Sequence, residues 1–333
     1  MSRIFFAPSK YVQGAGAIAS IGKYAETLGK KALLVGGETA LSNCKETIQT
    51  CLHEKNLACH QELFGGECAD REINRLVNVC KDQGIDFVIA AGGGKVIDTG
   101  KSVSHEMKIP IIVVPTTAAT DAPCSGEAVI YSDDGVFERE IVLSKNPDCI
   151  LVDTAIIAHA PTDLLVSGMG DALATYWEAD TCVKSNKPNV LTGEFPPTLT
   201  DITLARLCYD TLLEHGLMAK MAVEQNAVTP SVEAIVEANN LLSGLCFESG
   251  GLATAHMIGN LLSNEPECKQ KELMHGEKVA FGIITQLCLD DDYEVDDKHA
   301  IVDFQIRAGL PVTFAELNLA GVTRDRLQRI GEA

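Results

Sequence analysis

The sequence predicts an α/β fold in its N-terminal half and an all-helical fold in its C-terminal half. Up to residue 153, short apolar runs alternate with segments of helical periodicity. Most of these runs are continuously apolar, which is typical of parallel strands buried on both faces. After Pro161 no segment has the pattern of a strand. We therefore expect a sheet-bearing domain over residues 1–160 and a helical domain over residues 161–333, with a ligand site in the cleft between them.

The elements of the first half follow from apolar runs and turn residues. Strands are expected at Tyr11–Gln13, Ala32–Val35, His60–Leu63, Phe87–Ala91, Ile111–Pro115 and Ile150–Asp153. Helices are expected at Ile18–Leu28, Leu41–Lys55, Asp70–Asp82 and Lys95–Met107. The segments Ala128–Tyr131 and Phe137–Ile141 flank an Asp-Gly turn and predict a hairpin. Ligands of parallel sheets bind at the carboxyl ends of the strands, where the turns Gly36-Gly37, Gly92–Gly94 and Pro115–Thr117 converge.

The second half is expected to consist of helices and loops. Helical patterns cover Leu164–Ala179, Thr200–Leu213, Val232–Phe247, Leu252–Leu262 and Val279–Leu289. The acidic run Leu289–Asp297 has Val295 where a calcium-binding EF-hand loop needs glycine, so it predicts a solvated loop. The last residues, Thr323–Ala333, have the pattern of a helix cut short.

Composition excludes several classes of function. The formal net charge of -19 argues against nucleic-acid binding, which needs a basic surface. No apolar run has the length of a membrane span or of a signal peptide. The twelve cysteines form no Cys-x-x-Cys pair, which argues against a zinc ribbon and indicates reduced thiols. We therefore expect a cytoplasmic protein with no nucleic-acid or membrane partner.

The stretch Phe87–Lys101 predicts a phosphate site. Gly92–Gly94 connects a buried strand to a helix N-terminus, where free N–H groups and the helix dipole attract anions. The stretch matches neither a P-loop nor the dinucleotide Gly-x-Gly-x-x-Gly pattern, and a purely structural turn is the alternative. Glu38, just after the strand Ala32–Val35, could bind ribose hydroxyls or simply lie in a surface turn.

Two further groups of residues suggest chemistry. The small-residue loop Pro115–Ser125 offers hydroxyls to a phosphate or an amide, and its Asp121 could orient a substrate hydroxyl or relay a proton; an Asx turn is the alternative. In the helical half, Asp171 lies on a glycine-flanked helix, and His256 and His275 lie in or beside apolar helices. Together they fit a three-ligand catalytic metal with an open position, although single histidines in apolar helices are often buried core residues.

These motifs together resemble those of the iron-containing alcohol dehydrogenase superfamily. They are Gly-Gly-Gly-Lys-x-x-Asp-Thr-x-Lys at 92–101, Pro-Thr-Thr-Ala at 115–118, Asp121, Gly-x-Gly-Asp-Ala at 168–172 and His-Gly-Glu-Lys-Val at 275–279. The resemblance implies a Rossmann-like parallel sheet followed by a helical domain, as in dehydroquinate synthase. Iron-type members carry a further histidine one helical turn after the aspartate. Thr175 stands at that position here, so the chain is similar to the zinc-dependent glycerol dehydrogenases of this superfamily.

The resemblance also implies the ligands. Zinc would be held by Asp171, His256 and His275, and the substrate would contact these three residues and Asp121. NAD would lie between the domains, with its pyrophosphate on Gly94–Asp98. The implied NAD contacts are Gly37, Glu38, Gly93, Gly94, Lys95, Val96, Ile97, Asp98, Thr116, Thr117, Ala118, Ala119, Ser125, Glu127 and Tyr131. The acidic residue that members place at the ribose falls on Gly37 in this chain, and Glu38 follows one position later.

The implied activity is the NAD-dependent oxidation of glycerol and related vicinal diols, with glycerol giving dihydroxyacetone. Zinc, which has no redox role, would act as a Lewis acid while hydride leaves C2 for the nicotinamide. Members of the superfamily assemble into homo-oligomers, so we expect one here. Two alternatives stay open: an enzyme resembling glycerol-1-phosphate dehydrogenase, which would need basic residues at the substrate, and a non-catalytic NAD-binding relative.

Overall fold

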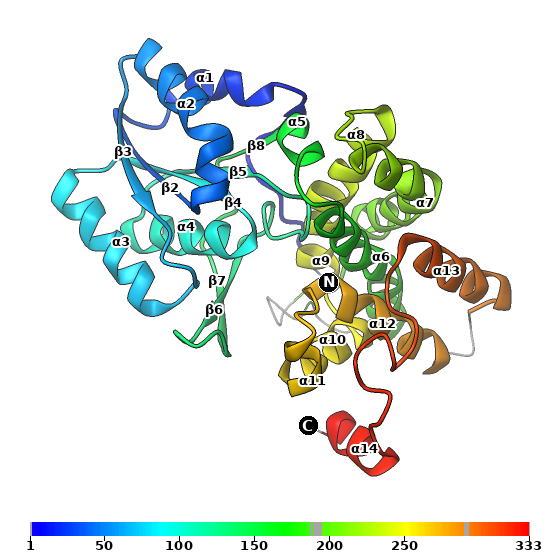
Figure 1. Cartoon of the computed structure of the whole chain (residues 1–333). Coiled ribbons are helices and arrows are strands. Elements are labelled where there is room, and N and C mark those ends of the chain that lie inside the picture. The colour runs from blue at the N-terminus through cyan, green and yellow to red at the C-terminus, as the bar shows by residue number, and fades with distance from the viewer. Residues whose placement is uncertain (1, 187–188, 190–194, 290–292, 333) are drawn as a thin grey trace.

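The computed structural model describes residues 2–186, 189, 195–289 and 293–332. A sheet-bearing part formed by the N-terminal half lies beside a bundle of helices formed by the C-terminal half (Figure 1). Within the described ranges, no helix combines the length and the apolar character that crossing a membrane requires.

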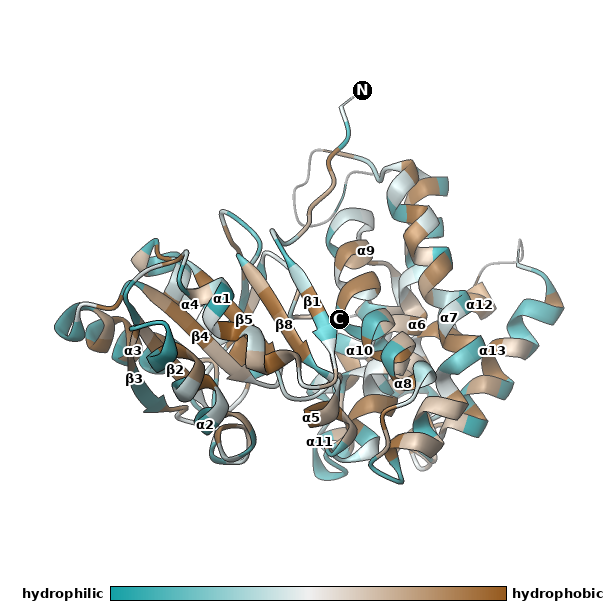
Figure 2. Cartoon of the chain, turned by 90° about the horizontal axis from the view of Figure 1, so that it is seen from above, coloured by the Kyte–Doolittle hydropathy of each residue, from teal (hydrophilic) through white to brown (hydrophobic). Residues whose placement is uncertain are grey.

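The main sheet has six parallel strands and confirms the predicted ones. They are β1 (Tyr11–Gly14), β2 (Lys31–Gly36), β3 (Ala58–Leu63), β4 (Phe87–Gly92), β5 (Ile111–Pro115) and β8 (Cys149–Asp153), in the spatial order β1-β8-β5-β4-β2-β3. Every residue of β4, β5 and β8 is buried, as the apolar runs predict. Strand β3 forms an edge and is largely polar, which Figure 2 shows in teal beside the brown central strands.

Helices cover both faces of this sheet, and each face has its own core cluster. They are η1 (Ala17–Ser20), α1 (Ile21–Ala25), α2 (Glu38–Glu54), α3 (Asp70–Gln83) and α4 (Gly94–Met107). The expected helix Ile18–Leu28 is wrong in extent, because a 3-10 turn precedes α1 and α1 ends at Ala25. The hydroxyl of Thr27 donates to the carbonyl of Tyr24 at 2.9 Å, a local bond that competes with the helical ladder.

The predicted hairpin is present as a separate two-stranded sheet. Its strands are β6 (Glu127–Tyr131) and β7 (Phe137–Val142), antiparallel, with a register shift at Ile130/Tyr131. The Asp98 carboxylate accepts a hydrogen bond from the Val129 N–H at 3.2 Å. The hairpin is thereby attached to helix α4, directly behind the glycine turn.

All elements after β8 in the described part of the chain are helical. They are α5 (Thr154–Ala158), α6 (Thr162–Ser185), α7 (Leu199–Val223), α8 (Pro230–Glu237), the π-helical η2 (Ala238–Leu242), α9 (Ser243–Gly250), α10 (Thr254–Asn264), α11 (Pro266–Gln270), α12 (His275–Leu289), α13 (Val295–Ala308) and α14 (Arg324–Glu332). The single helix expected over Val232–Phe247 is thus divided by a π turn, a feature that often marks functional sites.

One loop prediction is wrong in part. The acidic run Leu289–Asp297 was expected to be a solvated loop, but Leu289 ends α12 and Val295 begins α13. Asp296 and Asp297 lie in the first turn of α13, where carboxylates are stabilised by the helix dipole. Residues 290–292 of the run lie outside the described part.

The packing of α4 on β4 depends on a glycine and can be tested. A Cβ atom at Gly100 would overlap the Cβ of Ala90 on β4. We expect Gly100→Ala to lower the free energy of unfolding by about 1–3 kcal/mol, because overpacking outweighs the gain in helix propensity. Urea denaturation followed by circular dichroism measures this. Gly321→Ala is the control, because no atom lies within 4 Å of its Cβ position; equal stability of the two variants would contradict the expected overlap.

Candidate metal centre

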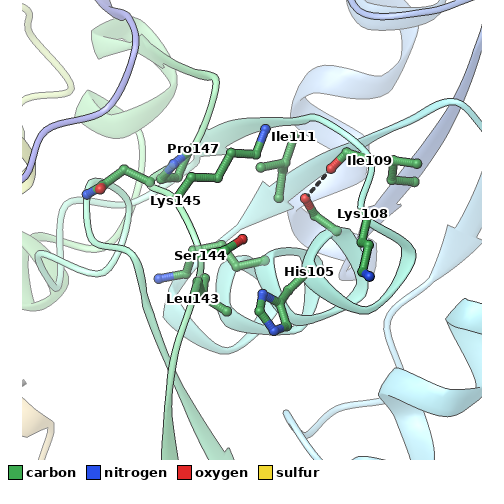
Figure 3. Close-up of a pocket in the computed structure, with 11 residues that line it drawn as sticks. His105, Lys108, Ile109, Ile111, Leu143, Ser144, Lys145 and Pro147 are labelled. Carbon is green, nitrogen blue, oxygen red and sulfur yellow. Dashed lines mark hydrogen bonds between the residues drawn. The ribbon is translucent and has the colours of Figure 1, made fainter.

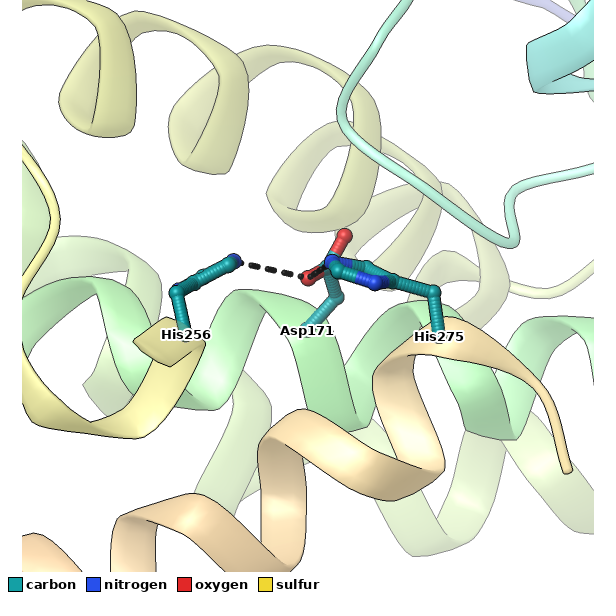
Figure 4. Close-up of side chains that lie close together, drawn as sticks. All are labelled: Asp171, His256 and His275. Carbon is teal, nitrogen blue, oxygen red and sulfur yellow. Dashed lines mark hydrogen bonds and ion pairs between the residues drawn. The ribbon is translucent and has the colours of Figure 1, made fainter. Parts of the chain in front are cut away.

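Three side chains from three helices meet in the helical part. Asp171 lies on α6, His256 on α10, and His275 is the first residue of α12 (Figure 4). The Oδ1 atom of Asp171 lies 3.2 Å from Nε2 of His256 and 3.4 Å from Nε2 of His275. One candidate ligand atom from each residue lies within 4.8 Å of the other two. The structure therefore brings together residues separated by up to 104 positions in the sequence (275 − 171).

Glycines allow the surrounding backbones to approach this point. A Cβ at Gly276 would overlap the carbonyl oxygen of Ser167, and one at Gly170 would overlap that of Gly276. A Cβ at Gly168 would overlap the carbonyl oxygen of Ala118 in the loop after β5. Because glycine has no Cβ, α6 contacts both α12 and this loop through backbone atoms.

The charges of the centre are set by burial and by its three members. Burial alone would raise the pKa of the Asp171 carboxyl, but the neighbouring His275 and His256 outweigh it and hold that pKa below its ordinary value. Burial would lower the pKa of His256, yet the carboxylates of Glu178 and Asp171 raise it well above its ordinary value. The pKa of His275 is lowered, chiefly by loss of solvation. The side chain of His275 is nevertheless 44% exposed, so it forms the solvent-facing side of the centre.

The donor set fits a divalent metal ion. The second oxygen of Asp171, Oδ2, is buried and has no hydrogen-bond partner among the described residues. Such an atom costs free energy unless a ligand satisfies it. Two imidazoles and one carboxylate are the ligand types of catalytic zinc sites that leave a fourth position open. These three residues could therefore hold a metal, with His275 on the accessible side.

Asp121 lies next to this centre and is held by the hydroxyl group of Ser243, which in turn contacts that of Thr175. The Ser243 hydroxyl donates to its Oδ2 at 2.9 Å, and Ser243 Oγ lies 3.0 Å from Oγ1 of Thr175. Since the Ser243 proton points to Asp121, Ser243 accepts its second bond from Thr175. Burial and the charge of Asp171 raise the pKa of Asp121 well above its ordinary value. Its carboxyl group is therefore harder to ionise than that of an exposed aspartate.

The glycine turn has the geometry of an anion site. Helix α4 begins at Gly94, and no side chain caps its N-terminus at Gly93. The turn lies beside the other two predicted turns, since Gly36 pairs with Ala91 and Gly92 with Pro115. The convergence of three strand ends is therefore confirmed. Uncapped N–H groups at one end of a fourteen-residue helix attract a negatively charged ligand.

The residues predicted to bind a cofactor lie around this edge of the sheet and differ in how far they are exposed to solvent. Gly37 is the N-cap of α2, and Glu38 is its exposed first residue rather than part of a turn. Lys95 is exposed and forms an ion pair with Glu67 at 2.6 Å. Partly exposed positions are Gly93, Gly94, Thr117, Ala119 and Tyr131. Buried positions are Val96, Ile97, Asp98, Thr116, Ala118, Ser125 and Glu127.

Lys101 contacts three of these buried polar residues, Asp98, Ser125 and Glu127, and the sequence reasoning did not assign it a role. It is 1% exposed, and its Nζ forms an ion pair with Asp98 at 2.9 Å. The same ammonium donates to the Ala122 carbonyl at 2.8 Å, the Ser125 hydroxyl at 3.3 Å and the Glu127 carbonyl. Lys101 therefore fixes the segment 122–127 on α4. Its i,i+3 spacing from Asp98 was the available signal.

Glu178 and Ser243 were also missed as site residues. Glu178 contacts His256, and it lies seven positions after Asp171 on the same helix, hence on the same face. That spacing was a usable signal for Glu178. Ser243 follows the π turn η2, and the sequence offers no local pattern for that turn.

A separate cavity lies away from this centre. It has a volume of about 340 Å³ and is lined by the end of α4, the start of β5 and the segment 143–147 (Figure 3). Ile111, at the start of β5, lines it, whereas the glycine turn meets the other end of that strand. None of the three candidate metal ligands lines it. The candidate functional site is therefore the cluster of the three metal ligands and not this cavity.

Glu248 joins the helical part to the loop that carries the site. Its carboxylate accepts hydrogen bonds from the Gly126 N–H at 2.9 Å and from the Asn146 amide at 2.6 Å. Burial raises its pKa from 4.5 to about 7, although these bonds act in the opposite direction. The native state therefore binds one more proton than the unfolded chain between these pH values.

This shift predicts a pH-dependent stability. A raised carboxyl pKa contributes stability that is complete below about pH 4.5 and is lost as the pH rises through 7. Between pH 4.5 and 7 we expect the free energy of unfolding of the wild type to fall by up to about 3 kcal/mol more than that of the Glu248→Gln variant. The reason is that glutamine does not titrate. Urea unfolding at several pH values measures the difference, and a constant offset from altered hydrogen bonding does not affect it. Parallel stability curves for the two proteins would contradict the assignment.

Comparisons with known proteins agree with the geometry. A family model described as "Iron-containing alcohol dehydrogenase" matches residues 8–154. The chain is 45% identical to a glycerol dehydrogenase of Thermotoga maritima, covering 98% of this chain and 87% of the relative. It is 43% identical to a glycolaldehyde reductase of Halobacterium salinarum, covering 100% and 90%. The crystal structure of a probable glycerol dehydrogenase from Sinorhizobium meliloti superposes with a TM-score of 0.92 at 40% identity, covering 100% and 90%.

Proposed function

The chain belongs to the glycerol dehydrogenases of the iron-containing alcohol dehydrogenase family, and we propose that it oxidises glycerol and related vicinal diols with NAD. Glycerol would give dihydroxyacetone. The observation that carries this proposal is the three-ligand centre of Asp171, His256 and His275 with the carboxyl group of Asp121 beside it. Hydrogen removal from an alcohol needs a group that polarises its oxygen and a group that handles its proton, and this arrangement offers both.

We propose that the two parts of the chain divide these tasks. Residues 1–160 would bind NAD, and residues 161–333 would bind metal and substrate. The uncapped start of α4 supports a pyrophosphate position on Gly94–Asp98. The fifteen residues named above as cofactor contacts keep this role as proposals, including the ribose contact of Gly37 and Glu38. The buried side chains among them would act by shaping the backbone, since Ser125 and Glu127 are already bound to Lys101.

Zinc is our proposal for the metal, because the ligand set has the types and number that catalytic zinc takes. Bound there, zinc would supply Lewis-acid polarisation of the substrate oxygens, and NAD would accept the hydride. Asp121 would orient a substrate hydroxyl through its own carboxyl group, held by Ser243. One hydride and one proton leave the alcohol, which balances the formation of ketone and NADH.

A second candidate function is the reduction of glycolaldehyde at the same centre. It is favoured by one specific finding, the 43% identity to a glycolaldehyde reductase. A phosphorylated substrate is less well supported. Lys95 pairs with Glu67, and Lys271 donates to the Glu316 carbonyl. A non-catalytic relative would not need the assembled metal ligands.

We also propose a cytoplasmic homo-oligomer. The twelve cysteines form no disulfide, which supports a reducing compartment. The subunit association is proposed from the family resemblance.

Metal removal tests the proposed mechanism. We expect the purified chain to contain zinc and to form NADH from glycerol, to lose this activity after dialysis against a strong chelator, and to regain it with Zn²⁺ but not with Mg²⁺. The reason is that an oxygen-preferring ion fits two imidazoles poorly. Elemental analysis provides the control for complete removal. Unchanged turnover by a protein shown to be metal-free would refute the zinc mechanism, and NAD binding without turnover of any diol or aldehyde would support the non-catalytic alternative.

The same preparation distinguishes the substrates. Values of kcat/KM for glycerol with NAD, glycolaldehyde with NADH and glycerol 1-phosphate with NAD rank the candidates directly. We expect kcat/KM for glycerol to exceed kcat/KM for glycerol 1-phosphate by at least tenfold, because recognition of a phosphate requires cationic side chains positioned around it.

Ser243 provides a test of the Asp121 assignment. We expect Ser243→Ala to lower kcat by up to about a hundredfold, because loss of its bond lets the Asp121 carboxyl move from its position. Zinc content should stay unchanged, since Ser243 contacts none of the three proposed ligands in the described structure. Ser249→Ala on the same helix is the matched control, because its hydroxyl accepts from the Phe6 N–H instead. Equal kcat in wild type and both variants would exclude a positioning role for Ser243.

A further inference from the structure

Glu178 is completely buried and forms three hydrogen bonds near the metal centre. It lies on α6 two helical turns after Asp171. Its Oε1 accepts from the backbone N–H groups of Ala253 and His256, each at 2.9 Å. Its Oε2 lies 2.5 Å from Nδ1 of the His256 ring. One carboxylate thus holds both the first turn of α10 and the side chain that this turn carries.

The two nitrogens of His256 face different partners. Nδ1 faces Glu178, while Nε2 faces Asp171 at 3.2 Å, at the point where the three candidate ligands converge (Figure 4). A neutral imidazole has one N–H and one lone pair, and a metal needs the lone pair. Ionised carboxylates only accept hydrogen bonds, and the Glu178 oxygen lies closer to Nδ1 (2.5 Å) than the Asp171 oxygen lies to Nε2 (3.2 Å), so the single proton of the neutral ring is favoured on Nδ1.

We infer that Glu178 is a positioning residue that fixes His256 in the tautomer with the proton on Nδ1 and the lone pair of Nε2 free for the metal. The inference rests on the proposed metal centre and adds a residue to it. A carboxylate behind a histidine ligand raises the basicity of the ligand and restricts rotation of its ring. His275 has no corresponding carboxylate at its other nitrogen among the described residues, so the contribution of Glu178 is specific to one ligand.

Glu178→Gln separates this role from a purely structural one. Glutamine keeps the shape, and its carbonyl oxygen can still accept from Ala253 and His256. Its NH₂ group would then face Nδ1 of His256 and require that nitrogen to be an acceptor. The proton would move to Nε2, where it blocks the metal. We expect the affinity for Zn²⁺ to fall about ten- to hundredfold in a competition titration with a chromophoric chelator.

The tautomer itself gives a readout that needs neither metal nor activity. Nitrogen-15 chemical shifts of the His256 ring, recorded on the metal-free protein at a pH where the ring is neutral, distinguish the two forms. We expect Nδ1–H in wild type and Nε2–H in Glu178→Gln. Wild type showing Nε2–H would overturn the inference, even if the variant failed to fold.

Gln286→Leu is the matched control. The Gln286 side chain accepts from the Ala255 N–H at 3.0 Å, so it holds the same turn of α10 without touching the His256 ring. We expect this variant to keep the wild-type tautomer and to lose less than threefold in zinc affinity. An equal loss in both variants, or retained affinity and tautomer in Glu178→Gln, would overturn the inference. Failure of wild type to bind zinc would instead refute the proposed function.

Discussion

The site depends on the contact between backbones where α6 meets α12 and the loop after β5. Side chains at Gly168 and Gly276 would overlap carbonyl oxygens of the neighbouring segments, so only glycine permits this distance. Asp171 follows Gly168 on the same helix, and His275 directly precedes Gly276. The separation of 3.4 Å between their carboxylate and imidazole is therefore a consequence of helix packing rather than of the two side chains alone.

Burial then gives the assembled side chains their charges. Asp171 and Asp121 are both buried and close enough for the charge of one to raise the pKa of the other. The imidazoles lower the pKa of Asp171, whereas burial and the charge of Asp171 raise the pKa of Asp121. The pKa values of two carboxyl groups in one buried site are thus shifted in opposite directions because their neighbours differ. A cation bound among the three ligands would balance the negative charge of Asp171, while the carboxyl group of Asp121 stays available to a substrate hydroxyl group.

The sequence was sufficient for the sheet but not for the supports of the site. Strands β4 and β5 could be predicted because buried parallel strands are continuously apolar, and the convergence of their turns follows from parallel topology. Glu178 lies on the predictable face of α6, but its partner is 78 positions away. Which helix packs against that face depends on tertiary contacts that helical periodicity does not specify. The π turn before Ser243 escapes prediction for the same reason, because packing and not local propensity sets it.

The loop after β5 is held from both parts of the molecule at adjacent residues. Lys101, on the helix that follows the glycine turn, donates to the carbonyl of Ala122, and Ser243, in the helical bundle, donates to Oδ2 of Asp121. The first bond fixes the loop relative to the proposed cofactor position and the second fixes it relative to the metal ligands. Hydride transfer requires its reacting atoms to lie about 3–3.5 Å apart. A loop attached to one part only would let that distance vary with every movement between the two, whereas attachment at neighbouring residues makes the loop a shared reference for both.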